Sequence, residues 1–156
     1  GMVGAAMTTH GTYAEAICDG HHLNPIAVRA LVNAKGADHT VLITDCMRAG
    51  GMPNGQYKLG DFPVVVEGGT ARLMDDSHSL AGSILRLFEG VKNVYDWGVV
   101  SAEEAVRMAS ENPARSCGID DVCGFIRPGY DADFIVITKN LQLEETFLGG
   151  KSVYKA

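Results

Sequence analysis

Two groups of ionisable residues are placed where they could carry out proton chemistry. Residues 19–22 are Asp-Gly-His-His, and Asp45 follows Thr44. Carboxylates and imidazoles are the side chains that most often transfer protons near neutral pH. Each group comes directly after a short apolar run, so its chemistry depends on what those runs form.

The elements around these groups have the pattern of a parallel strand–helix–strand unit. The runs 13–18 and 40–44 are apolar and are predicted to be buried strands. Between them, the pattern predicts a helix over 24–36, because Asn24-Pro25 suits a helix start and Gly36 suits its end. Polar residues after parallel strands are where α/β folds place their chemistry, which makes candidates of Asp19, His21, His22 and Asp45.

The middle of the chain predicts a small antiparallel sheet. A glycine-rich loop at 48–55 leads to strands near 56–59, 64–67 and 71–74. The small residues 79–83 then predict a loop that opens a helix, with Ile84, Leu85, Leu87 and Phe88 on its apolar face.

The last third predicts helices and then a β ribbon. Ser101 and Glu104 form a capping box for a helix through Ala109, and Asn112-Pro113 is expected to end or bend it before another short turn of structure at 114–118. An apolar strand at 132–138 is followed by a ribbon, 141–147 with 152–154, around Gly149-Gly150. Residues 2–11 have no assignable pattern.

Composition narrows the class of protein. The 156 residues are 46% hydrophobic and 21% charged, which is typical of a globular domain with its own core. The net charge of −6 comes without a basic block, which argues against nucleic acid or an anionic membrane as partner and favours a small molecule. No run reaches the roughly 20 apolar residues of a membrane span, and a cytoplasmic location is expected.

The four cysteines show no CxxC pair and no disulfide-dense spacing. Cys18 and Cys46 lie in or beside the apolar runs, where a free thiol behaves as a small apolar side chain. Only Cys46, beside Asp45, is placed for thiol catalysis.

Several of these motifs, taken in order, resemble a known family. Residues 124–136, Gly-Phe-Ile-Arg-Pro-Gly-Tyr-Asp-Ala-Asp-Phe-Ile-Val, with Asn-Pro-Ala-Arg at 112–115, resemble the C-terminal signature of the amidohydrolase superfamily. Within it, the motifs at 19–22, 44–45 and 80–83, followed by Phe-Glu-Gly-Val-Lys-Asn at 88–93, are similar to the N-acetylglucosamine-6-phosphate deacetylase family. The resemblance extends from about residue 3 to residue 154.

The resemblance implies an α/β fold, the C-terminal part of a (β/α)8 metal-dependent hydrolase barrel plus part of a small β-sandwich. Residues 2–122 would hold the last two barrel strands and their helices, with a β-hairpin insertion near 55–74, and residues 123–156 the sandwich tail. A complete barrel takes about 250 residues. The exposed strand edges of a partial barrel lead us to expect self-association, as a homodimer that completes the sheet.

The resemblance also implies roles for single residues. Asp45 would be the general base toward water and then the acid toward the leaving amine. A divalent metal, zinc or iron, would assist, but the family's ligands, a glutamate and two histidines, lie before the start of this chain, so no metal ligand is expected in it. Substrate contacts would come from Asp19, Gly20, His21, His22, Leu80, Ala81 and Gly82.

The predicted function is that of the C-terminal part of a deacetylase. The whole enzyme would hydrolyse N-acetylglucosamine 6-phosphate to glucosamine 6-phosphate and acetate, and this chain by itself is expected to be inactive. Two alternatives stay open: a non-catalytic truncated domain that self-associates, and another amidohydrolase acting on a cyclic amide. From the residues alone, a strand-terminal turn cap is the favoured interpretation of Asp45, and a surface or helix-entry histidine is the alternative interpretation of His22.

Overall fold

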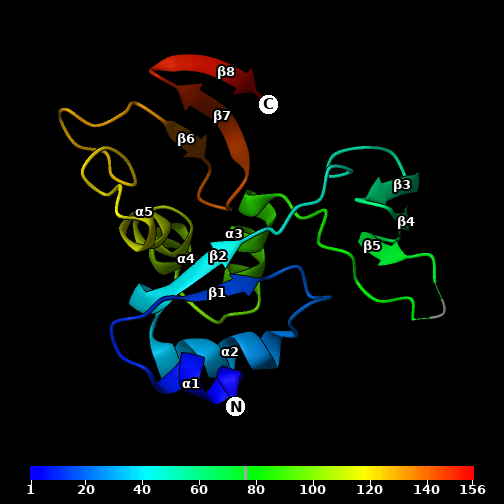
Figure 1. The fold of residues 1–156 in the computed structure, drawn as a ribbon. Helices are drawn as coiled ribbons and strands as arrows, with labels where there is room; N and C mark the ends of the chain where they lie inside the picture. The colour runs from blue at the N-terminus through cyan, green and yellow to red at the C-terminus, as the bar shows by residue number, and fades with distance from the viewer. Residues whose placement is uncertain (76) are drawn as a thin grey trace.

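A parallel strand–helix–strand unit lies at the centre of the structure (Figure 1). In this computed structural model, which describes residues 1–75 and 77–156, β1 (Ala14–Ile17) pairs in parallel with β2 (Thr40–Ile43). The helix α2 (Pro25–Lys35) connects the two strands, and a short 3-10 turn (Ala37–His39) leads into β2. The pairing confirms the parallel unit predicted from the two apolar runs.

The connecting helix begins and ends where its sequence predicts. The side-chain oxygen of Asn24 accepts a hydrogen bond of 2.8 Å from the N–H of Ile26, which satisfies a donor that the first turn leaves free. Gly36 ends the helix with a φ of 84°, a conformation that side chains disfavour. The face that packs on the sheet contributes the buried side chains Val28 and Val32.

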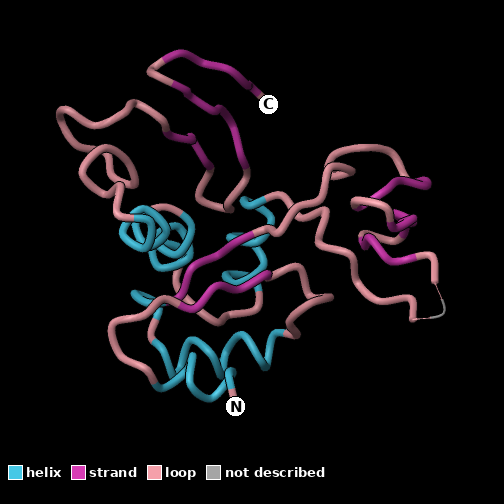
Figure 2. The backbone as a smooth tube through the Cα atoms, in the orientation of Figure 1, coloured by secondary structure: helices cyan, strands magenta, loops and turns pink. Residues whose placement is uncertain are grey.

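Helices cover both faces of the two strands (Figures 1 and 2). The helix α1 (Met2–Thr8) packs on α2 on one side, while α3 (Leu87–Asp96), α4 (Ala102–Ala109) and α5 (Glu111–Cys117) contact β2 on the other. None of the described helices is long and apolar enough to cross a membrane. The core between these layers is made of Ala16, Cys18, Val28, Val32, Leu42, Val91, Val94, Ala105 and Met108.

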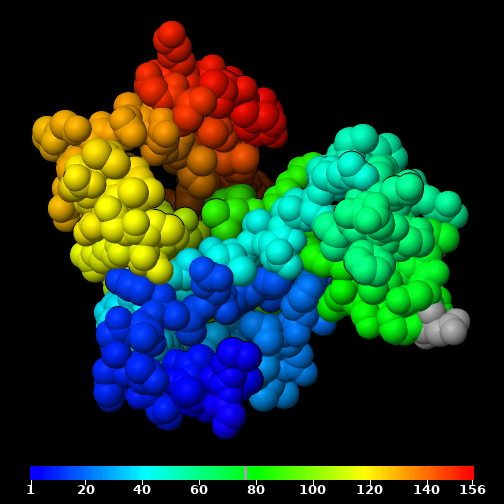
Figure 3. Space-filling view, viewed as in Figure 1, coloured from blue at the N-terminus to red at the C-terminus, as the bar shows by residue number. Residues whose placement is uncertain are grey.

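Two antiparallel sheets extend from this unit as separate lobes (Figure 3). One contains β3 (Gly55–Leu59), β4 (Phe62–Glu67) and β5 (Thr70–Leu73), and the other β6 (Phe134–Ile137), β7 (Leu143–Leu148) and β8 (Lys151–Lys155). Both confirm strand pairings predicted from the sequence. The first sheet has a core of its own, formed by Met47, Ala49, Val64, Val66, Ala71 and Ala81.

Three segments differ from the sequence-based expectation. Residues 2–8, which show no local pattern, form a helix because they pack against α2. The helix expected to open at Ser83 begins only at Leu87, since the backbone of Ser83 pairs with that of Cys46. The helix expected to end at Asn112-Pro113 already ends at Ala109, and Pro113 lies in the first turn of α5, where it costs no helical hydrogen bond.

Asn112 fastens α5 to the start of β2. Its side chain is fully buried, and its Nδ2 donates hydrogen bonds of 2.7 Å to the backbone oxygens of both Ala37 and Thr40. Those carbonyls lie at the point where the chain enters β2, so the amide group holds the strand against the helical layer.

We therefore expect Asn112→Ala to lower the free energy of unfolding by about 2–4 kcal/mol, because the buried carbonyl of Thr40 and the partly buried carbonyl of Ala37 each lose a hydrogen bond. Urea unfolding followed by circular dichroism measures this change. Asn33→Ala, at an exposed position of α2, is the matched control and should change stability by no more than about 0.5 kcal/mol. Equal unfolding midpoints for the two variants would contradict the role given to Asn112.

Candidate functional site

The register of β1 and β2 brings the two polar clusters to one end of the sheet. Ile17 lies opposite Ile43 in the parallel pair, and Asp19 and Asp45 each follow by two residues. Neighbouring strands lie about 4.8 Å apart, so their carboxyl ends share one edge. The structure thus places both predicted carboxylates at the same edge.

Asp19 organises the turn that follows β1. Its Oδ1 accepts hydrogen bonds from the N–H of His21 at 2.9 Å and of His22 at 2.8 Å, and its Oδ2 lies 2.7 Å from Nδ1 of His22. A carboxylate only accepts, so Nδ1 of His22 carries the proton and donates it. The ring of His22 is thereby oriented, with Nε2 as the nitrogen that can meet a ligand.

These contacts set the protonation of Asp19. Burial raises the pKa of its carboxyl group, but the hydrogen bonds from the backbone and ring of His22 and the backbone of His21 outweigh that effect, and the pKa is lowered. The side chain of Asp19 is only 9% exposed. Its carboxylate is thus engaged by the turn, which makes it a group that positions His21 and His22.

Asp45 is different, because it is exposed and has an unusual backbone conformation. Its φ is 46°, in the left-handed region, which Asp adopts more readily than most residues. Its backbone oxygen accepts a hydrogen bond of 2.8 Å from the N–H of Ser83, and the N–H of Met47 donates to the oxygen of Ser83 at 2.8 Å. The segment that carries Asp45 is therefore paired with the segment that ends at Ser83.

This pairing brings the predicted substrate loop, Leu80, Ala81 and Gly82, against Asp45. On its other side the loop extends the β3–β5 sheet, since Leu80 bridges to Arg72 and the N–H of Ala81 donates to the oxygen of Ala71 at 2.9 Å. Gly82 has a φ of 65°, and a Cβ at this position would stand 2.9 Å from the backbone oxygen of Asp45. The close approach of the two segments requires glycine here.

The other predicted residues lie at the rim of this edge. His21 is exposed, and a Cβ on Gly69, in the β4–β5 turn, would stand 3.6 Å from its Nε2. Gly20 faces Trp97, whose ring would lie 3.6 Å from a Cβ there. Sequence reasoning did not single out Gly69 or Trp97, because only the folded chain brings the β4–β5 turn and the end of α3 to residues 20–21.

Asn93 and Ser83 are further residues that sequence reasoning left without a role. Nδ2 of Asn93, on α3, donates a hydrogen bond of 2.9 Å to the backbone oxygen of Cys18 and so holds the end of β1. Ser83 lay in the small-residue motif at 80–83 and Asn93 in the motif at 88–93, but neither motif indicated these contacts. Both act on backbone groups far away in the sequence, and no spacing rule reports such contacts.

The cysteines are free thiols in this structure. Cys18 is buried, and burial together with the nearby charge of Asp19 raises the pKa of its thiol to about 12, so it stays protonated at neutral pH. Cys46 is exposed, and its Sγ lies 3.4 Å from the backbone oxygen of Met47. Cys18 therefore behaves as the apolar core residue that its strand pattern predicts.

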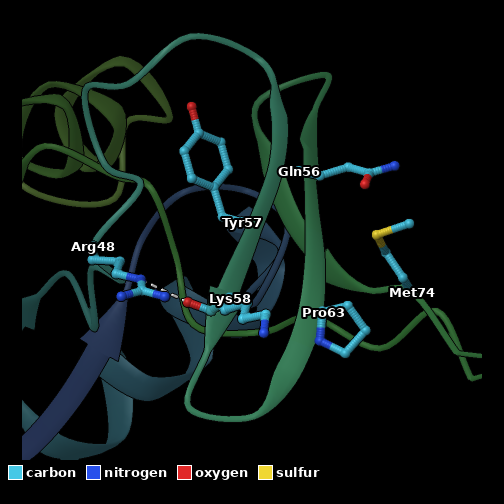
Figure 4. Close-up of a pocket in the computed structure, with 6 residues that line it drawn as sticks. All are labelled: Arg48, Gln56, Tyr57, Lys58, Pro63 and Met74. Atoms are coloured by element: carbon cyan, nitrogen blue, oxygen red, sulfur yellow. Dashed lines mark hydrogen bonds between the residues drawn. The ribbon is translucent and has the colours of Figure 1, made fainter.

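Two surface pockets lie away from these residues. One, of about 360 Å³, is on the β3–β4–β5 sheet, where Nε of Arg48 donates to the backbone oxygen of Lys58 at 2.9 Å (Figure 4). The other, of about 480 Å³, runs beside α1, β1 and α2. Neither is lined by a predicted site residue. Asp45 and His21 instead stand on an exposed surface.

Among the residues that the structure describes, the donor groups do not fit a metal centre. A metal held by protein side chains needs three or more suitable donors. Within residues 1–75 and 77–156, no group of three or more His, Cys, Asp or Glu is placed to hold an ion. His22 already uses Nδ1 to contact Asp19.

Comparisons with known proteins find relatives that match nearly the whole chain. The sequence profile of the amidohydrolase family matches residues 4–153. An N-acetylglucosamine-6-phosphate deacetylase from Vibrio furnissii is 40% identical over the whole chain, which spans 38% of that protein. An N-acetylgalactosamine-6-phosphate deacetylase from Escherichia coli O157:H7 is 38% identical over 97% of the chain, which spans 39% of it.

A solved structure shows the same arrangement of elements. The N-acetylglucosamine-6-phosphate deacetylase of Thermotoga maritima superposes with a TM-score of 0.91 and 33% identity. The match covers 100% of this chain and 42% of that one. The chain thus spans about two fifths of the length of these relatives.

The turn at residues 19–22 makes a prediction about acid stability. Because the pKa of Asp19 is lowered by folding, its carboxylate stabilises the fold above the unfolded value of about 3.9, and this contribution is lost as the pH falls through the folded value. The difference in unfolding free energy between the wild type and Asp19→Asn should therefore be larger at about pH 6 than at about pH 3.

Urea unfolding at both pH values measures this difference. Asn33→Ala changes no ionisable group and should differ from the wild type by the same amount at each pH. A difference for Asp19→Asn that does not shrink in acid would show that the hydrogen bonds of Asp19 do not favour its ionised form.

Proposed function

Because the chain belongs to the amidohydrolase family, we propose that it takes part in removing the acetyl group of N-acetylglucosamine 6-phosphate, giving glucosamine 6-phosphate and acetate. The observation that carries this proposal is the pairing of the Asp45 segment with the loop that ends at Ser83, through hydrogen bonds of 2.8 Å. That pairing gives one exposed carboxylate, which suits a proton carrier, and one adjoining loop, which suits a contact with a small substrate.

Asp45 would move the proton. Its carboxylate takes a proton from the water that attacks the acetyl carbon and later gives it to the nitrogen when the C–N bond breaks. One group can do both because the proton gained in the first step is the one needed in the second. The exposed position of Asp45 leaves room for a substrate beside it.

The neighbouring residues would hold the sugar phosphate. His22 offers Nε2, since Nδ1 is bound to Asp19, and the backbone of Gly20 and His21 forms the same turn. Leu80, Ala81 and Gly82 would contribute main-chain groups beside Asp45. A divalent metal finds no set of three donors among the described residues, so the proposal assigns to this chain only proton transfer and substrate contacts.

In this proposal the fold corresponds to the end of a larger one. The β1–α2–β2 unit and its covering helices would form the last part of a (β/α)8 barrel, within residues 2–122, and β6–β8 would belong to a β-sandwich tail over residues 123–156. The galactosamine epimer is a second candidate substrate, because the Escherichia coli relative carries the name of an N-acetylgalactosamine-6-phosphate deacetylase.

A chimera tests the role of Asp45. In the Vibrio furnissii deacetylase, the segment that aligns with this chain is replaced by these 156 residues. We expect the chimera to deacetylate N-acetylglucosamine 6-phosphate, and Asp45→Asn to lower kcat by about 10²–10⁴-fold with little change in KM, because only the proton transfer is lost. Acetate release, with both epimers assayed and zinc or ferrous ion added, measures the rate.

Asp61→Asn, an exposed aspartate in the β3–β4 turn, is the matched control and should leave kcat unchanged. Near-normal turnover of the Asp45→Asn chimera would contradict the proton-transfer role of Asp45. A folded, metal-loaded chimera that releases no acetate from either epimer would count against the proposed function as a whole.

The open edge of β1 leads us to propose that the chain also forms a homodimer. Among the described strands β1 pairs only with β2, and the groove beside it is lined by apolar side chains that include Val3, 70% exposed. Size-exclusion chromatography with light scattering at micromolar concentration should give twice the monomer mass of 16.6 kDa. Val3→Lys should shift the equilibrium to monomer, because it places a charge in the groove.

Val122→Lys, at a residue 46% exposed in the segment after α5, adds the same charge elsewhere and should leave the dimer intact. A wild-type chain that stays monomeric at this concentration would contradict self-association through the β1 edge.

A further inference from the structure

Ser83 connects three parts of the candidate site: the segment that carries Asp45, the loop of residues 80–82, and the β3–β5 sheet. It is 2% exposed, and its backbone bridges in parallel to Cys46. Its N–H donates to the oxygen of Asp45 at 2.8 Å, and its own oxygen accepts from the N–H of Met47 at 2.8 Å. These two bonds lie on either side of Cys46, and the first of them holds the backbone of Asp45.

The side chain of Ser83 adds contacts that a smaller residue could not make. Its hydroxyl donates to the backbone oxygen of Thr44, the residue before Asp45, and accepts from the N–H of Leu85 at 3.1 Å. A serine hydroxyl has one hydrogen to donate, and here that hydrogen is used. Thr44, Asp45 and Met47 are thus all held by one buried residue.

The contacts of Ser83 are important because the backbone of Asp45 has a left-handed conformation, which is unfavourable for most residues with a side chain. A φ of 46° in a residue with a side chain persists only when surrounding contacts hold it. The direction of the Asp45 side chain follows from that backbone, so contacts that hold the backbone also aim the carboxylate.

The same serine connects Asp45 to the β3–β5 sheet. Two residues before it, Ala81 is buried in the core of that sheet and donates to the oxygen of Ala71 at 2.9 Å. Met47, two residues after Asp45, is buried in the same core. The sheet and the segment that carries the carboxylate are therefore connected through Ser83.

We propose that Ser83 is a positioning residue, which holds Asp45 in its left-handed conformation and fixes the loop of residues 80–82 beside it. The inference rests on the proposed function of Asp45, since it assigns to Ser83 the task of aiming that carboxylate. It gives Ser83 no contact with the substrate.

The first test measures the conformation itself and needs no ligand. In the isotope-labelled 156-residue chain, Ser83→Ala should make the amide hydrogen of Met47 exchange about tenfold faster and shift the Asp45 resonances, because one buried hydrogen bond is lost. Ser83→Thr keeps the hydroxyl and should restore both. If Ser83→Ala does not fold, Ser83→Cys, similar in size but a weak donor, replaces it.

Ser101→Ala is the control, because it also removes a serine hydroxyl that accepts a backbone hydrogen bond, here from the N–H of Glu104 at the exposed start of α4. It should lower global stability without changing Met47 exchange relative to the amides of β1 and β2. Unchanged Met47 exchange and Asp45 resonances in Ser83→Ala would overturn the inference.

The second test connects the conformation to binding. Titration of the labelled chain with N-acetylglucosamine 6-phosphate should show an affinity at least about tenfold weaker in Ser83→Ala than in the wild type, restored in Ser83→Thr and unaffected in Ser101→Ala. Equal affinity of Ser83→Ala and wild type would overturn the inference. No binding to the wild type would count against the proposed function, and the exchange measurement would still decide the role of Ser83.

Discussion

The parallel pairing of β1 with β2 is the constraint on which the rest of the structure depends. Two parallel strands need a connection that returns the chain to its starting end, and α2 supplies it. Their carboxyl ends then lie together, which places Asp19 and Asp45 on one edge. The register of the two strands aligns Asp19 with Asp45, because each lies two residues after the paired positions Ile17 and Ile43.

A second constraint comes from the β3–β5 sheet. Met47 and Ala81 are buried in its core, yet they lie in the two segments that flank Asp45. The conformation around Asp45 is therefore determined jointly by the β1–β2 unit and by a sheet that is a separate lobe in Figure 3. We infer that the sheet is part of the structure that shapes the site, although it adds no ionisable residue to the predicted set.

The sequence predicted the elements whose signals are local. The cap at Asn24, the capping box at Ser101 and the glycine turns of both antiparallel sheets act within a few residues, and the structure has each of them. The helix α1 and the start of α3 were missed because distant contacts decide them: α1 packs on α2, and Ser83 pairs with Cys46. Asp19, His21, His22 and Asp45 became candidates from their position after the two predicted strands, and the resemblance supplied their roles and the other contacts. The contacts of Ser83 and Asn93 required the folded chain.

The carboxylates of Asp19 and Asp45, at the same edge of the sheet, differ in whether they already accept hydrogen bonds from the protein. Asp19 accepts three hydrogen bonds from His21 and His22, so its carboxylate stabilises the turn at residues 19–22. Asp45 is exposed, and within residues 1–75 and 77–156 its hydrogen bonds involve its backbone and not its carboxylate. A proton carrier must gain and lose its proton during each cycle, which a carboxylate saturated by donors does poorly. The physical contrast between the two groups therefore favours Asp45 as the acid and base, with Asp19 as the residue that orients His22.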